Sequence, residues 1–353
     1  MTFNKIIKFS YKQIKKGRCF IVSEISANHS GNFSNLKLLI NKLSKAGVDA
    51  IKIQAYEAKT ITIESSKRDF KISRNNTWAK YKTLYDLYKK AETPFSWYKK
   101  IFHYCKKKNV IIFASVFDKT SLKLLEKINC PAYKIASPEI TDVPLISAVA
   151  KTKKPIIISN GLANIKDLNL AVKTVKKEKN KNLILLQCTS SYPTPLNEVN
   201  LITMRALEKK YKCLTGFSDH TLGSSTSIHA ASLGACMIEK HVGLKENDSV
   251  DSFFSINDEE LKKMIKTIRK NEISSGQVKF GVSKSSKMNL NGRRSLYVVK
   301  NIKKGEKFTE ENIRSIRPTY GLHPKFLKNF LNKNSNNELK KGTRLSWKFI
   351  KKK

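Results

Sequence analysis

Eight short β-rich runs, each followed by a helix-like stretch, fill the chain from Cys19 to about Ser275. The runs are FIVSEIS, DAIKIQ, VIIFAS, AYKIAS, PIIISN, LILLQC, CLTGFS and CMIEKH. Such apolar, β-branched runs are typical of parallel strands buried on both faces. Eight strand–helix units in about 250 residues predict an α/β fold, a (β/α)8 TIM barrel, because an open doubly wound sheet usually has fewer strands. No glycine-rich dinucleotide motif follows the first run, which argues further against a Rossmann fold.

The stretches between the runs carry helix signals. After the first run, apolar residues fall at helical spacing from a cap expected near Ser34 to a stop at Gly47. Asn164 is expected to cap a later helix, with Asp167 in its first turn. Both patterns support helices that pack on the outside of a barrel.

One long interval, Tyr56 to Thr93, separates the second run from the next helix. Loops of that length in a compact domain are usually functional elements. We therefore expect a lid over the barrel mouth, although a peripheral decoration is the alternative. Its aromatic residues are Trp78, Tyr81, Tyr85 and Tyr88.

The pattern changes past Ser275, where a polar, glycine-containing stretch has the composition of a linker. The remainder reads as short strands with turns, in a β-rich module too small to bury much surface alone. We predict a barrel domain at residues 1–280, a linker at 281–294 and the small module at 295–353.

Charge and composition limit the class of protein. The formal net charge of +41 is compatible with a basic nucleic-acid-binding protein, but the lysines are dispersed, so attraction of anionic substrates is the preferred interpretation. No apolar run reaches the roughly 20 residues of a membrane span, and the N-terminus does not resemble a secretory signal. The six cysteines form no CxxC pair, which favours free thiols and a cytoplasmic location.

Polar side chains stand at the expected carboxyl ends of all eight runs, where TIM-barrel enzymes place their active sites. His220 and His241 follow two successive runs, so neighbouring strands would present both imidazoles to one cavity. Imidazole is a common metal ligand, and the pair predicts a metal site. Any single histidine or serine has an ordinary structural explanation, but the full set predicts an active-site rim.

Long motifs over nearly the whole chain resemble the sialic acid synthase family. They include SEISANHSG, DAIKIQAY, YKIASPEITDVPLI, QCTSSYPTP, GFSDHTLG, IEKHVGL and RRSLYVVKNIKKGEKFTEENIRSIRP. The TSSYP and LYDLY segments favour the branch that makes pseudaminic acid. The small module is similar to the SAF, or antifreeze-like, domain that ends these enzymes.

The resemblance implies a transferase that condenses phosphoenolpyruvate with an open-chain amino sugar and releases phosphate. For this branch the sugar would be 2,4-diacetamido-2,4,6-trideoxy-L-altrose. The resemblance also implies that His220 and His241 bind Mn²⁺ or Mg²⁺, which would polarise the sugar aldehyde for attack by C3 of phosphoenolpyruvate. A legionaminic or N-acetylneuraminic acid synthase, using a manno-configured sugar, is the alternative within the same chemistry.

Site roles are carried over by matching motifs. Glu24 and Glu139 would handle protons or orient water, alongside the two histidines. Phosphoenolpyruvate needs cations and hydroxyl donors; the matching positions are Lys52, Lys134, Ser115, Ser137, Ser159, Ser190 and Ser218. The positions that match sugar contacts are Gln54, Tyr192 and Asp251.

Two further expectations concern partners. Lys134 lies in an apolar run, where an unpaired ammonium is costly, so we expect a bound anion or a carboxylate beside it. Arg317 resembles the arginine that the small domain inserts into the neighbouring subunit's barrel, which implies a domain-swapped homodimer; an ordinary surface charge is the alternative.

Overall fold

The computed structural model describes residues 9–14, 18–245 and 248–350. The chain divides into two compact units, Met1–Gly276 and Gln277–Lys353. Each is considered by itself.

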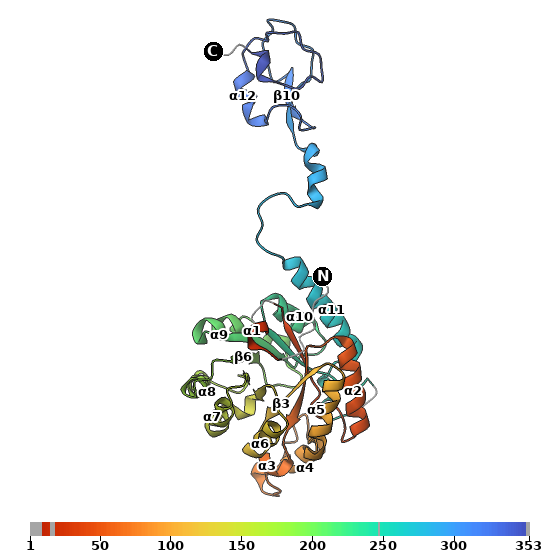
Figure 1. Ribbon diagram of the computed structural model, residues 1–353, viewed down its shortest axis with the longest axis vertical. Coiled ribbons are helices and arrows are strands. Elements are labelled where there is room, and N and C mark those ends of the chain that lie inside the picture. Colours follow the sequence, from red (N-terminus) through yellow and green to blue (C-terminus); the bar gives the residue numbers. More distant parts are fainter. Residues whose placement is uncertain (1–8, 15–17, 246–247, 351–353) are drawn as a thin grey trace. The chain divides into compact units, whose positions relative to one another are not determined.

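The first unit is a closed barrel of eight parallel strands in sequence order, which confirms the predicted TIM-barrel class (Figure 1). β8 pairs with β1 and closes the barrel, so that His241 lies opposite Glu24. The strands are β1 (Phe20–Glu24), β2 (Ala50–Ala55), β3 (Ile111–Val116), β4 (Tyr133–Ile135), β5 (Ile156–Ser159), β6 (Leu183–Cys188), β7 (Leu214–Asp219) and β8 (Met237–His241).

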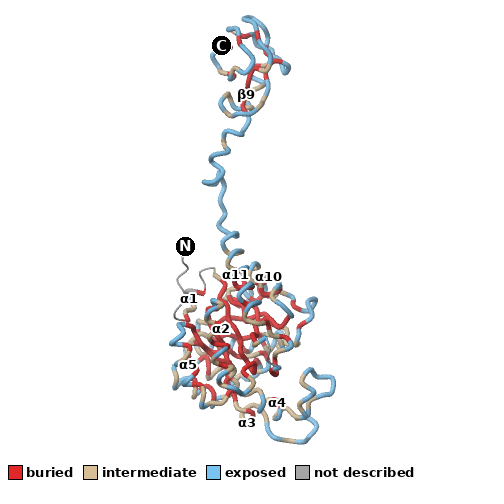
Figure 2. Tube along the Cα trace, turned by 90° about the vertical axis from the view of Figure 1, so that its right-hand side faces the viewer, coloured by how far each residue is buried: buried red, intermediate tan, exposed pale blue. Residues whose placement is uncertain are grey.

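A layer of helices surrounds the strands, and Figure 2 shows buried residues concentrated inside this layer. The helices of this layer are α2 (Phe33–Ala46), α5 (Tyr98–Lys107), α6 (Lys119–Lys127), α7 (Val143–Lys151), α8 (Ile165–Lys177), α9 (Thr203–Tyr211), α10 (Ser225–Ser232) and α11 (Asp258–Ser275). The shorter helices of this unit are α1 (Tyr11–Ile14), α3 (Ala58–Ile61) and α4 (Leu84–Ala91), with 3-10 turns η1 (Arg68–Phe70), η2 (Phe95–Trp97), η3 (Ser137–Thr141), η4 (Leu196–Glu198) and η5 (Ser252–Phe254).

Local sequence explains where the helices begin and end. The side chain of Asn32, two residues before Ser34, caps α2 by accepting from two backbone N–H groups. An asparagine oxygen in extended backbone suits this position as well as serine does. Gly47 ends α2 at a φ of 89°, as predicted, because glycine adopts the left-handed region without strain. Asn164 caps α8, also as predicted.

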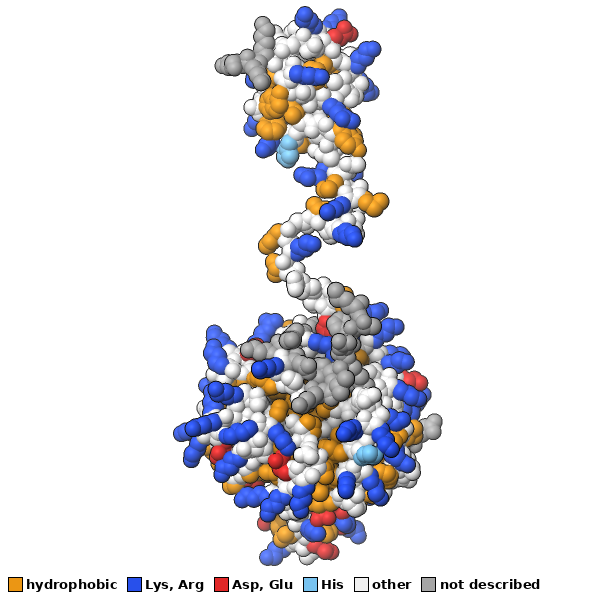
Figure 3. Space-filling view, in the orientation of Figure 1, with side chains coloured by type: hydrophobic (Ala, Val, Ile, Leu, Met, Phe, Trp, Pro, Cys, Tyr) orange, Lys and Arg blue, Asp and Glu red, His pale blue; other side chains and the backbone are white. Residues whose placement is uncertain are grey.

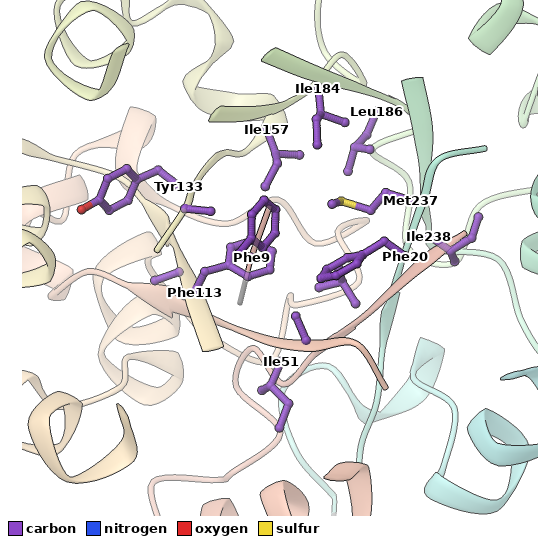
Figure 4. Packing of buried hydrophobic residues seen from close by; sticks show 14 of the residues in the cluster. Phe9, Phe20, Ile51, Phe113, Tyr133, Ile157, Ile184, Leu186, Met237 and Ile238 are labelled. Atoms are coloured by element: carbon purple, nitrogen blue, oxygen red, sulfur yellow. The ribbon is translucent and has the colours of Figure 1, made fainter. Parts of the chain in front are cut away.

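The amino end of the barrel is closed by an aromatic side chain from the N-terminal segment. Phe9 lies between Phe20 of β1 and Phe113 of β3, at ring-centroid distances of 5.2 and 5.5 Å (Figure 4). Edge-on packing of this kind adds to the burial of apolar area. Apolar side chains therefore fill this part of the barrel interior.

The second unit has a small apolar core of its own. Its strands β9 (Ser295–Val298) and β10 (Ile313–Ile316) pair antiparallel. Helical turns η6 (Ser285–Gly292), η7 (Pro324–Phe326), α12 (Leu327–Phe330) and η8 (Trp347–Phe349) complete it. The turn η6 falls within the stretch predicted to be a linker. The core residues include Leu296, Val298, Ile302, Phe308, Ile313, Phe330, Leu339 and Leu345.

Two surface properties bear on the class of protein. Lys and Arg side chains are spread over the visible face of the barrel unit and do not gather over one element (Figure 3). Across the residues that the structure describes, no helix has both the length and the apolar character to cross a membrane.

Candidate active site

The carboxyl ends of the barrel strands surround a cavity of about 570 Å³. A volume of this size suits small-molecule substrates. Most of the predicted site residues meet here: Lys52, Gln54, Ser115, Lys134, Ser137, Glu139, Ser159, Tyr192, Ser218, His220, His241 and Asp251.

Three buried charged residues, Lys52, Lys134 and Glu239, line the cavity, and a fourth, Glu24, lies beside them. Lys134 Nζ lies 3.2 Å from Glu239 Oε1, and Lys52 Nζ lies 3.6 Å from the same oxygen. Lys52 also forms an ion pair with Glu24 of β1. The carboxylate partner expected for Lys134 is therefore present, and it is Glu239. Burying such charges costs desolvation free energy, so buried charges of this kind are typical of functional sites.

These charged groups change one another's pKa values. Burial alone would raise the pKa of Glu239, but the ammonium groups of Lys134 and Lys52 outweigh burial and lower that pKa to about 2. Burial raises the pKa of Glu24, against the opposing effect of Lys52. Glu239 therefore remains an anion that holds both lysines, while Glu24 is the easier of the two carboxylates to protonate.

Hydroxyl groups surround the lysines. Lys52 Nζ donates to Ser115 Oγ at 2.8 Å, and Ser218 Oγ donates to Glu239 Oε1 at 3.1 Å. Within the described residues, the buried hydroxyls of Ser159 and Ser190 have no hydrogen-bond partner. Unsatisfied buried donors are costly unless a ligand completes them. Cations with unused hydroxyls form a suitable cradle for an anion.

Gly161 is required by the close packing of this cradle. Its backbone N–H donates to Ser137 Oγ at 3.0 Å. A Cβ at this position would come within 2.9 Å of the same hydroxyl oxygen and even closer to that of Ser190. A side chain at residue 161 would therefore displace the serines.

The two predicted metal ligands meet on the same side of the cavity. The ring centroids of His220 and His241 are 5.4 Å apart. His220 Nδ1 lies 2.9 Å from the Thr189 carbonyl oxygen, which can only accept, so Nδ1 carries a proton and Nε2 holds the lone pair whenever the ring is neutral. Burial lowers the pKa of His220, but Cys188 and the Thr189 carbonyl outweigh burial and raise it. Burial lowers the pKa of His241 well below its usual value, so this ring is neutral near pH 7.

The pair fits a divalent ion that also binds water or substrate. Buried His241 Nδ1 has no hydrogen-bond partner among the described residues, and the His220 ring lies next to the His241 ring. Over the same residues, no cluster of three or more His, Cys, Asp or Glu side chains is arranged to hold a metal. Mg²⁺ and similar ions often keep several waters, so two protein ligands are compatible with binding.

A second carboxylate and an aromatic ring flank the histidines. Asp251 Oδ2 lies 4.0 Å from His241 Nδ1. The Tyr192 ring packs on His220 with a centroid distance of 4.4 Å. Both residues line the cavity.

Glu139 is the remaining titratable group of the rim. It lies in η3, directly after β4, and its Oε2 atom is buried without a hydrogen-bond partner among the described residues. Burial raises the pKa of this carboxyl to about 7. A group with that pKa exchanges protons readily at neutral pH.

The interval from Tyr56 to Thr93 covers the cavity, as predicted for a lid. It is partly helical, since it contains α3 and α4. Trp78 and Tyr88 line the cavity, whereas Tyr81 and Tyr85 do not. The Trp78 indole N–H donates to the Val250 carbonyl at 3.0 Å, which ties this segment to the loop after β8.

Three predicted site residues lie outside the cavity wall. Glu24 is fully buried and does not line the cavity, although it forms an ion pair with Lys52, its register partner on β2. Ser190 stands behind the wall beside Gly161. Arg317 is exposed in the second unit, directly after β10.

Sequence reasoning missed several residues that line the cavity. Glu239 stood out at the end of its strand but received no role, although an acid inside the apolar run MIEKH was the available signal. The missed residues of the lid show no helical or strand periodicity in the sequence, so their positions at the cavity could not be predicted. The missed residues are Ser26, Lys71, Ser73, Asn76, Cys188 and Glu239.

Comparison with known proteins relates the whole chain to one group. The NeuB family matches residues 39–280, and the SAF domain matches residues 293–351. The chain is 40% identical to the pseudaminic acid synthase of Campylobacter jejuni over 93% of this chain and 95% of that protein. It is 36% identical to the N,N'-diacetyllegionaminic acid synthase of the same species, over 90% and 95%. The solved N-acetylneuraminic acid synthetase of Leptospira borgpetersenii superposes with a TM-score of 0.67 at 30% identity, covering 77% of this chain and 90% of that one.

Proposed function

Because this chain belongs to the NeuB family, we propose that it is a pseudaminic acid synthase. It condenses phosphoenolpyruvate with 2,4-diacetamido-2,4,6-trideoxy-L-altrose and water to give pseudaminic acid and phosphate. The observation that carries the proposal is the convergence of two imidazoles, two lysines and serine hydroxyls on one cavity. The higher identity to the pseudaminic than to the legionaminic synthase supports the choice of sugar.

The residues of the cavity divide the work of binding. Lys52 and Lys134 hold the carboxylate and phosphate of phosphoenolpyruvate, and Ser159 and Ser137 donate to its oxygens. The negative charge of Glu239 keeps both lysines extended toward the ligand. Asp251, Gln54 and Tyr192 orient the sugar so that its aldehyde carbon faces C3 of phosphoenolpyruvate.

Proton handling falls to the carboxyl groups. A C–C bond forms between C3 of phosphoenolpyruvate and the aldehyde carbon, while the aldehyde oxygen gains a proton. Water adds at C2, and the C–O bond to phosphate breaks as the 2-keto group forms. Glu139, with a pKa near neutrality, is suited to accept the proton of that water. Glu24 stabilises the charged form of Lys52.

His220 and His241 would hold Mn²⁺ or Mg²⁺. When bound, such an ion supplies Lewis-acid polarisation of an aldehyde oxygen. Direct Mn²⁺ binding, followed by its paramagnetic signal, tests this assignment; loss of binding in His241→Ala and His220→Ala supports it. Activity that survives chelation of all divalent ions would contradict it.

The substrate assignment is tested by phosphate release with a panel of sugars. The altro-configured sugar is expected to be turned over in preference to the manno-configured precursors of legionaminic and N-acetylneuraminic acids. Preference for a manno sugar would replace this assignment by the legionaminic or N-acetylneuraminic one. No phosphate release with any sugar, together with salt-sensitive nucleic-acid binding, would favour a basic binding protein.

The assembly belongs to the same proposal. Arg317 of one chain would enter the barrel of a second chain in a domain-swapped homodimer, in the cytoplasm, where sugar precursors and phosphoenolpyruvate are made. A guanidinium is suited to bind the carboxylate of a substrate.

A further inference from the structure

Ser26 has a backbone conformation that serine rarely adopts. It follows β1 and has a φ of 48°, in the left-handed region. Residues with a Cβ are strained there, whereas glycine adopts this region freely. Ser26 is 3% exposed, and it lines the cavity. A side chain retained at such a position, in contact with a site, suggests that the side chain has a use there.

That use is visible in two hydrogen bonds to two different carboxylates. The backbone N–H of Ser26 donates to Glu24 Oε1 at 2.6 Å. Its hydroxyl donates to Asp251 Oδ2. The left-handed turn directs the backbone N–H back to β1 and the hydroxyl across to the loop after β8.

The bond to Asp251 matters because of where that carboxylate lies. The same oxygen, Oδ2, is 4.0 Å from His241 Nδ1, and Asp251 lines the cavity. Asp251 belongs to the turn before η5, not to a barrel strand, so the strand ladder does not fix its position. A hydrogen bond from Ser26, next to a strand, couples this carboxylate to the rigid barrel.

We propose that Ser26 is a positioning residue for the amino sugar, which orients the Asp251 carboxylate toward the sugar's hydroxyl and amide groups. This inference rests on the proposed function, since it assigns Asp251 to the sugar. It concerns the sugar because the hydroxyl of Ser26 donates to Asp251, whereas only the backbone N–H of Ser26, which S26G keeps, reaches Glu24, the ion-pair partner of Lys52.

The test compares Ser26→Gly with Ser26→Ala. Glycine keeps the backbone bond to Glu24, removes the hydroxyl and relieves the left-handed strain. We expect S26G to raise the KM for the sugar about tenfold, the loss of one hydrogen bond to a charged group. Its KM for phosphoenolpyruvate should stay within about twofold, and its Tm should not fall. S26A should show the same rise in sugar KM with a lower Tm.

Ser30→Gly is the matched control, since Ser30 also lies in the left-handed region, at a φ of 52°, but does not line the cavity. It should leave both KM values unchanged. An unchanged sugar KM in S26G, or an equal rise in both KM values, would overturn the positioning role. A parent enzyme that fails to use the altro sugar would instead overturn the proposed function, and the S26G comparison would then be made with the sugar that is turned over.

Discussion

Burial in the cavity changes the protonation equilibria of single side chains from those they have in water. Glu139 shows this clearly, since burial raises the pKa of its carboxyl from 4.5 to about 7. The folded protein therefore binds this proton more tightly than the unfolded chain does. Its contribution to stability is complete below pH 4.5 and is lost as pH rises from 4.5 to about 7.

Glu139→Gln should abolish the loss of stability between pH 4.5 and about 7, because glutamine resembles the protonated acid and does not ionise. The variant is expected to be close to the parent in stability near pH 4.5, and more stable by about 3 kcal/mol at pH 8. At the same time, its rate of phosphate release should fall. Urea unfolding at the two pH values measures the first effect.

Glu198→Gln is a suitable control, since Glu198 is exposed in η4. Its effect on the free energy of unfolding should be small at both pH values. If E139Q gains the same free energy of unfolding at pH 4.5 and pH 8, the Glu139 carboxyl of the parent protein is not protonated at neutral pH.

An ion pair buried outside the cavity joins the neighbouring strands β7 and β8. Asp219 of β7 and Lys240 of β8 are register partners, and their charged atoms lie 3.1 Å apart. Both side chains are fully buried. Because side chains alternate along a strand, these two point toward the helix layer while the neighbouring His220 and His241 face the cavity. The ion pair thus fixes the strand ends that carry both imidazoles.

Lys240→Met leaves the Asp219 charge buried without its ammonium partner. We expect a loss of about 3 kcal/mol in the free energy of unfolding. Neutralising both partners, in D219N/K240M, should cost less than K240M alone. Urea denaturation of the three proteins provides the comparison.

The pair of exposed Lys89 and half-buried Glu92 in the lid offers a contrast, with N and O atoms 2.6 Å apart. Lys89→Met should cost less than about 1 kcal/mol, because solvent screens exposed charges. Equal losses for K89M and K240M would mean that burial does not set the strength of the Asp219–Lys240 pair.

The whole chain consists of two units, each with its own apolar core. If Arg317 of one chain completes the barrel of another, defects in the two units should complement each other. Arg317→Ala and His220→Ala should each be nearly inactive. Co-refolded, they should recover about a quarter of the native rate, since half of the dimers are mixed and each mixed dimer has one intact site.

Phosphate release after mixing measures this recovery. The control mixes His220→Ala with His241→Ala, whose defects fall in the same unit, and no recovery is expected. A mixture of R317A and H220A that remains inactive would mean that each site is built from a single chain.

The sequence by itself determined the elements and most of the rim. Eight buried runs with helices between them permit few arrangements, and parallel strands of a closed barrel bring their carboxyl ends together. His220, His241 and Lys134 could therefore be assigned to one site before any coordinates. Local capping was also readable, although only the structure places the cap of α2 on Asn32, because several polar residue types suit one cap.

Only the tertiary structure decided which charges are paired and what covers them. The sharing of Glu239 by Lys52 and Lys134, the bond from Ser26 to Asp251 and the contact of Trp78 with Val250 join segments far apart in the chain. No periodicity encodes such contacts, because they depend on side-chain directions after the barrel has closed. Propensity and spacing act along the chain, whereas buried electrostatics acts through space.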